Sequence, residues 1–151
     1  MTTPAEKPGF MRTMEHKLEI GDTLADFVVG LSPTYAKVRL HDLIADHLIL
    51  ILASTSCSAC ESALEALYER VSETGTPAHN IVLLIEASGE EVAEMRTIFR
   101  DRIRVFGVTT HLMREHLHMR YLPFGYCLVG DGIIAAMSMV SSRGALEQLL
   151  A

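Results

Sequence analysis

Two cysteines, Cys57 and Cys60, stand where a buried strand is expected to end and a helix to begin. The apolar run at 48–53 has the length of a strand buried on both faces, and residues 58–74 carry apolar side chains at helical spacing. The first turn of a helix leaves amide donors unpaired, and these donors and the helix dipole stabilise a thiolate there. The pattern predicts a redox pair in which Cys57 attacks and Cys60 resolves.

The overall composition narrows the class of protein. A chain of 151 residues with 49% hydrophobic and 21% charged residues is typical of one compact globular domain. Three cysteines are too few for a small secreted fold held together by disulfides. The formal charge of −6 and the pI near 5.6 argue against nucleic acid or an anionic membrane as the main partner.

The N-terminal segment at 1–20 is mostly polar and need not be ordered, which leaves 21–151 as the folded domain. It contains no apolar run long enough for a signal peptide or a membrane anchor. The longest apolar run of the chain, 48–53, has the length of a strand. The sequence as it stands therefore predicts no membrane segment and a cytoplasmic location, or an extracytoplasmic one if an anchor has been removed.

Strand and helix signals alternate along the rest of the chain. Strands are predicted at 26–30, 37–40, 48–53, 81–85 and 103–106, followed by a hairpin of 124–129 and 133–140. Helical segments are predicted at 41–45, 58–74, 88–100, 109–118 and 142–150. This order predicts an α/β protein with a central mixed sheet and helices on both faces.

The same order, with Leu122-Pro123 just before the hairpin, resembles the thioredoxin fold. Residues 21–27 resemble the leading segment of membrane-anchored thiol-disulfide proteins and peroxiredoxins, which implies an N-terminal strand extension. The Ser/Thr-rich turn 54–56 and the ending 130–143 are most similar to the methylamine-utilisation accessory (MauD/TlpA-like) family. The resemblance covers roughly 21–151. It implies a thiol-disulfide oxidoreductase that needs no cofactor and acts on a protein partner with thiols or a disulfide.

The resemblance also implies what surrounds the cysteines. In the thioredoxin fold, the proline before the hairpin is cis and faces the redox pair, so Pro123 should lie against Cys57. The backbone of Leu122 should then hold an extended substrate segment in line with the attacking sulfur. Ser58 and Ala59, between the two cysteines, complete the expected substrate-binding surface.

The sequence departs from the thioredoxin pattern in ways that affect the mechanism. There is no tryptophan, so Ser56 replaces the aromatic residue that commonly precedes the first cysteine, and no proline lies between the cysteines. Ile51 stands where thioredoxins carry a buried acid that assists proton transfer. Glu86, at the end of the next buried strand, is the candidate substitute, with a solvated loop carboxylate as the alternative. The direction of electron flow stays open, because Ser58 and Ala59 supply no fixed charge.

Two other functions share the same residues. A metal-binding or metallochaperone module would use Cys57 and Cys60, but it must recruit further ligands from Cys127 or from histidines. The cluster at 111–118 does not have the required spacing, because His111 and His116 are five residues apart, and no metal site is predicted there. A peroxiredoxin-like peroxidase lacks the proline expected seven residues before its cysteine, where Leu50 stands.

Cys127 and the acidic residues of the predicted helix 58–74 are expected to have structural roles and no part in the reaction. Cys127 falls in an apolar strand, where a free cysteine is expected in the core, with a third redox thiol as the alternative. Acidic residues recur every four positions on the predicted helix 58–74 and are expected to form a solvated face that disfavours acidic partners; they are Glu61, Glu65, Glu69 and Glu73.

Overall fold

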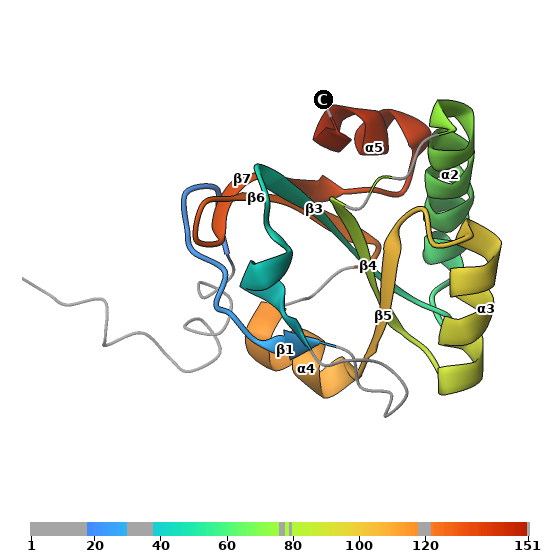
Figure 1. The fold of residues 1–151 in the computed structure, drawn as a ribbon, viewed down its shortest axis with the longest axis horizontal. Coiled ribbons are helices and arrows are strands. Elements are labelled where there is room, and N and C mark those ends of the chain that lie inside the picture. Colours follow the sequence, from blue (N-terminus) through green and yellow to red (C-terminus); the bar gives the residue numbers. More distant parts are fainter. Residues whose placement is uncertain (1–17, 30–37, 76–77, 79, 118–121, 151) are drawn as a thin grey trace, which may run out of the picture.

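The computed structural model describes residues 18–29, 38–75, 78, 80–117 and 122–150 (Figure 1). The predicted N-terminal segment 1–20 therefore lies largely outside the described residues. None of the described helices is long and apolar enough to span a membrane.

Five strands form the central sheet in the order β5-β4-β3-β6-β7. The strands are β3 (His47–Ser54), β4 (Ile81–Glu86), β5 (Arg104–Val108), β6 (Phe124–Val129) and β7 (Ile133–Met139). β3, β4 and β5 are parallel, whereas β6 pairs antiparallel with both β3 and β7. The predicted mixed sheet is therefore confirmed, with the hairpin beside the first central strand.

β3 lies in the middle of the sheet and supplies side chains to two hydrophobic cores. Leu48, Leu50 and Leu52 pack into the core on one face, and Ile49, Ile51 and Ala53 pack into the core on the other. Successive side chains of a strand point to opposite faces, so a continuous apolar run is what a strand covered on both sides requires.

Helices cover both faces, as predicted. Those on the Ile51 face are α2 (Ser58–Thr74), α3 (Gly89–Phe99) and α5 (Arg143–Leu150), and the opposite face carries α4 (Thr110–Leu117) and the short 3-10 helix η2 (Leu40–Leu43). In Figure 1, α2, α3 and α5 lie together at the right and top, and α4 lies below the sheet. The start of α2 is thereby held against the end of β3.

The helix boundaries follow local signals in the sequence. α2 ends at Gly75, whose φ of 68° is in the left-handed region that glycine adopts at low cost. α3 begins with a capping box, in which the Ser88 hydroxyl accepts from the Glu91 amide and the Glu91 carboxylate accepts from the Ser88 amide.

The N-terminal strands are shorter than predicted. β1 (Val28–Val29) and β2 (Val38–Arg39) form a separate antiparallel pair, and the predicted strand start at Asp26 is wrong. The Asp26 carboxylate instead accepts a hydrogen bond from the His41 amide at 2.9 Å. This hydrogen bond ties the segment before β1 to the first turn of η2. The chain before β1 joins the main sheet at the start of β7, where Thr23 forms a bridge with Ile133 and backbone hydrogen bonds link residues 21–24 to 132–134.

Candidate functional site

Cys57 is the residue from which α2 begins. β3 ends at Ser54, and the Cys57 amide donates back to the Ser54 carbonyl at 3.2 Å, so the turn between strand and helix is short. Cys57 has extended backbone angles, and its side chain makes no capping hydrogen bond to the helix. The Cys60 amide donates to the Cys57 carbonyl at 3.1 Å, and the dipole of α2 favours negative charge on a sulfur atom at this end of the helix.

Cys60 lies one turn further along α2 and is fully buried, whereas Cys57 is half-buried. Both cysteines are free thiols. Burial raises the pKa of the Cys60 thiol to about 12, helped by its hydrogen bond with Cys57 and opposed by a backbone hydrogen bond with Ser54. The two sulfurs thus have unequal access to solvent, which matches the unequal roles predicted for them.

Leu122 lies beside Cys57, and Pro123 follows it directly. The peptide bond between them is cis, and the Cys57 thiol donates to the Leu122 carbonyl oxygen with a sulfur to oxygen distance of 3.7 Å. Pro123 is buried directly before β6, and Leu122 is half-buried and packs against both cores. The segment before the hairpin is therefore a wall of the site.

Ser58 and Ala59, the two residues between the cysteines, are both exposed at the start of α2. They form the outer surface of the first helical turn next to the half-buried Cys57. Their position is open to a partner molecule.

Glu86 lies at the C-terminal end of β4 and not in a solvated loop. It is the last residue of β4, it is half-buried, and it stands opposite Ser54 in the parallel pairing of β3 and β4. The Ser54 hydroxyl donates to Glu86 Oε1 at 2.8 Å and lies 2.9 Å from the Ser56 hydroxyl. A carboxylate is thus connected to the residue whose backbone contacts Cys60.

The sequence drew attention to the turn 54–56 but did not predict the hydrogen bonds that Ser54 and Ser56 make. Ser54 is the one buried polar residue among those described, with 3% of its surface exposed. Its signal in the sequence was a hydroxyl at the end of an otherwise apolar run, where a buried polar group requires a partner. The partner could not be named from the sequence, because it depends on the register between β3 and β4.

Cys127 lies away from the redox pair. It stands opposite Ile49 in the pairing of β6 with β3, five residues before the end of β3 at Ser54. At about 3.3 Å per strand residue, that offset is roughly 16 Å. Cys127 is half-buried, packs against the core under α2 and α5, and has its thiol pKa raised by burial.

The histidines considered as ligands do not form a described metal centre. His111 is exposed on α4, and His118 lies outside the described residues. Within the described parts of the chain, no three residues of the types His, Cys, Asp and Glu are grouped so that they could hold a metal ion.

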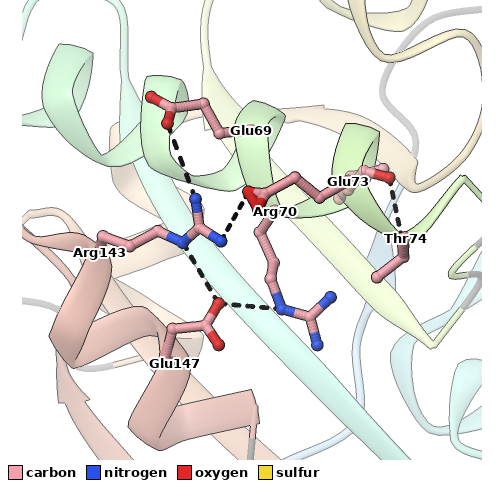
Figure 2. Close-up of polar contacts among 7 residues, drawn as sticks. Glu69, Arg70, Glu73, Thr74, Arg143 and Glu147 are labelled. Atoms are coloured by element: carbon pink, nitrogen blue, oxygen red, sulfur yellow. Dashed lines mark hydrogen bonds and ion pairs between the residues drawn. The ribbon is translucent and has the colours of Figure 1, made fainter.

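The acidic residues of α2 divide into two pairs with different surroundings. Arg143 of α5 bonds to Glu73 at 2.7 Å and lies 3.7 Å from Glu69, and its partner Glu147 also pairs with Arg70 at 2.9 Å (Figure 2). These ion pairs join the second half of α2 to α5. Glu61 and Glu65 are exposed and have no ion pair among the described residues, and both line a groove between α2 and α3.

No family model and no curated protein matches the chain, whereas solved structures do. The thioredoxin domain of a thiol-disulfide oxidoreductase from Bacteroides vulgatus is 13% identical and has a TM-score of 0.62, covering 89% of this chain and 100% of that one. A thio-disulfide isomerase from Thermus thermophilus is 18% identical with a TM-score of 0.64, covering 88% and 95%. The exposed lipoprotein thioredoxin of Streptococcus pneumoniae is 17% identical with a TM-score of 0.58, covering 83% and 98%.

At these identities the likeness establishes the fold. The sheet order, the pair of cysteines at the start of α2 and the cis bond before β6 agree with it. The chain is a thioredoxin-like α/β domain.

Proposed function

We propose that this protein is a thiol-disulfide oxidoreductase that exchanges a Cys57–Cys60 dithiol with a disulfide in protein partners. The observation that carries the proposal is the unequal pair: a half-buried sulfur at the start of α2 and a buried sulfur one turn later. Such a pair can form a bond with a partner at one sulfur and break it with the other. The names of the similar solved structures support the same activity.

The exchange consists of two substitutions at sulfur. The Cys57 thiolate attacks one sulfur of the partner's disulfide, which breaks that bond, forms a mixed disulfide and releases the partner's other sulfur as a thiolate. Cys60 then gives up its proton and attacks the Cys57 sulfur, so the internal disulfide forms and the partner leaves as a dithiol. Two electrons pass from the protein to the partner. The reverse sequence oxidises a partner dithiol, and the relative reduction potentials decide the direction.

The wall beside Cys57 supplies the contacts for an extended partner segment. The Leu122 backbone lies next to the attacking sulfur, Pro123 holds that backbone at the start of β6, and Ser58 and Ala59 form the exposed surface opposite. Backbone hydrogen bonding at Leu122 would align a partner's disulfide with Cys57. The motifs shared with the methylamine-utilisation accessory proteins favour a dedicated protein client over a broad range of substrates.

Glu86 is proposed as the acceptor of the Cys60 proton, with Ser54 as a positioning residue. A buried thiol with a raised pKa needs a base before it can attack, and Glu86 is the carboxylate bonded to Ser54. The Ser54 hydroxyl donates to that carboxylate, and the Ser54 backbone contacts Cys60. This arrangement would serve the role that the buried acid serves in thioredoxins, from a different strand.

A redox titration with mass spectrometry tests the proposal. In buffers of increasing ratio of oxidised to reduced glutathione, the full chain should convert reversibly to a Cys57–Cys60 disulfide with a two-electron dependence. Cys127→Ser is the matched control and should titrate at the same potential. Failure to form the bond at any ratio would contradict the proposal. One tightly bound metal ion per chain, lost in Cys57→Ser, would instead favour the metal-binding alternative.

A further inference from the structure

The surface between α2 and α3 contains an apolar groove that none of the proposed chemistry uses. The part nearer the redox pair has a volume of about 370 Å³ and a floor of Leu64, Met95, Ile98 and Phe99. A second hollow of about 230 Å³ continues it toward Arg100 and Arg102, and Tyr68 lines both. We call the two together the α2/α3 groove.

The groove exposes large apolar side chains. Ile98 is 47% exposed and Tyr68 is 41% exposed, and both line the groove together with the buried Phe99. The Tyr68 and Phe99 rings pack edge to face with centroids 6.0 Å apart, so the Tyr68 ring is already held in place. Grouped apolar side chains with a fixed aromatic are typical of an interaction surface.

Charge is distributed unequally along the groove. Glu61 and Glu65 border the end next to the redox pair and have no ion pair among the described residues, whereas Arg100 and Arg102 border the far end. Glu69, between them, is partly neutralised by Arg143 (Figure 2). A complementary partner is therefore basic where it lies near the cysteines.

The groove begins one helical turn from Cys57, the residue that directly precedes α2. Counting from Cys57, Glu61 is at i+4, Leu64 at i+7 and Tyr68 at i+11, which are positions stacked along one side of a helix. At 1.5 Å per residue, Leu64 lies about 10 Å along the helix from Cys57. A segment docked in the groove is thus in reach of the attacking sulfur.

From these observations we infer that the α2/α3 groove docks a basic amphipathic helix of the client protein, close to the client's reactive cysteine. The groove lies between two helices and offers no free strand edge, so it suits a segment that satisfies its own backbone hydrogen bonds. The helix dipole places the client's helix N-terminus at Glu61 and Glu65 and its C-terminus at Arg100 and Arg102. The reactive cysteine therefore precedes the helix by three to five residues, about the number needed to span 10 Å.

The inference concerns the client of the proposed oxidoreductase, so its first test removes the redox chemistry. The full chain carrying Cys57→Ser and Cys60→Ser is titrated against a fluorescein-labelled peptide of about twelve residues, three helical turns, with leucines on one face and lysines flanking them in its N-terminal half. We expect saturable binding, at least tenfold tighter than for the same peptide with glutamates in place of the lysines. Equal binding of the two peptides would overturn the inference.

Groove variants locate the binding site. Tyr68→Ala with Ile98→Ser should weaken binding of the lysine peptide at least tenfold, and Ile133→Ser, on exposed β7, should leave it unchanged. Glu61→Gln with Glu65→Gln should weaken it several-fold and reduce its dependence on salt. Glu90→Gln with Glu94→Gln, on the exposed part of α3 outside the groove, is the charge-matched control. An equal loss of affinity in the two pairs of glutamine variants would show attraction to net charge alone and would overturn the inference. A dimer of the protein that Ile98→Ser dissociates would also overturn it, because the groove would then be occupied by a second copy of the chain.

The orientation is tested with the unmodified chain. Two lysine peptides carry one mixed disulfide each, four residues before or after the helical part, and their reduction by the protein is compared with that of a small disulfide. We expect the first peptide to be reduced faster, through a lower KM, and the Tyr68→Ala, Ile98→Ser variant to lose this preference while it reduces the small disulfide normally. If the small disulfide is not reduced either, the oxidoreductase proposal fails. Peptide binding by the double cysteine variant would still show whether the groove docks a basic helix.

Discussion

The Leu122 carbonyl oxygen lies 3.7 Å from the Cys57 sulfur, although 65 positions separate the two residues in the chain. The contact exists because β6 lies beside β3 in the sheet, so the residue before one strand meets the turn that follows the other. The Leu122 backbone therefore borders the Cys57 sulfur directly. In the proposed exchange, this contact would form one side of the path by which a disulfide approaches.

The three thiols should differ strongly in their reactivity toward iodoacetamide. In the reduced native protein at pH 8, a thiol with a pKa of about 12 is ionised in about one molecule in ten thousand, so Cys60 should hardly react. Cys127 is half-buried with a raised pKa and should react slowly. Peptide mass spectrometry should find Cys57 modified at least about 100-fold faster than Cys60. In guanidinium all three should react alike, and faster native labelling of Cys60 would contradict the assigned roles.

Glu86→Gln should slow the resolving step while it preserves the hydrogen bond from Ser54. We expect release of a chromogenic aryl thiol from a mixed disulfide at Cys57 to slow by about tenfold at pH 7, because the base for Cys60 is lost. The deficit should shrink as the pH rises toward the pKa of Cys60. Glu90→Gln, an exposed carboxylate on α3, is the control.

Ser54→Ala separates a positioning role from a structural one. It should lower the free energy of unfolding by about 1 kcal/mol, because the half-buried Glu86 carboxylate loses its donor. It should also shift the pH profile of resolution in the same sense as Glu86→Gln. Loss of stability with an unchanged pH profile for both variants would remove Glu86 and Ser54 from the mechanism.

The order of elements and the position of the two cysteines at the start of α2 could be predicted from the sequence because their signals are local. The run in β3, the spacing in α2 and the Gly75 stop each depend on neighbouring residues. The hydrogen-bond partner of Ser54 depends on the register between β3 and β4. Which acidic residues of α2 form ion pairs and which border the groove depends on where α5 and α3 pack. Such tertiary contacts cannot be predicted from any short segment of the chain.

Gly125→Ala should destabilise the packing of β6 against α5. A Cβ at this position would collide with Leu149 Cδ2 and lie 3.2 Å from Val140 Cγ1, within a buried core. Overpacking of this kind costs about 1–3 kcal/mol in the free energy of unfolding, measured by urea denaturation. Gly89→Ala, at the start of α3 with open space around it, is the matched control and should be neutral or slightly stabilising. An equal effect of the two changes would contradict the packing described.

Tyr126 should make the protein sensitive to alkaline pH. Burial raises the pKa of its phenol to about 12, and its hydroxyl donates to the Leu117 carbonyl at 3.3 Å. Since the folded-state pKa exceeds the ordinary value of 10, the phenol's contribution to stability is complete below pH 10 and is lost as the pH rises toward 12. Urea unfolding of Tyr126→Phe should show about 1 kcal/mol lower stability at pH 8 and a shallower decline above pH 10. The oxidised protein is used, so that the Cys60 thiol does not titrate in the same range.

The most direct test of the central claim is which sulfur forms the bond with a partner. Cys60→Ser, incubated with a peptide that contains a disulfide, should accumulate a mixed disulfide that mass spectrometry assigns to Cys57 and that a reductant releases. Cys57→Ser should accumulate none, because the remaining Cys60 sulfur is buried. A mixed disulfide mapped to Cys60 in Cys57→Ser, with none at Cys57 in the other variant, would contradict the account.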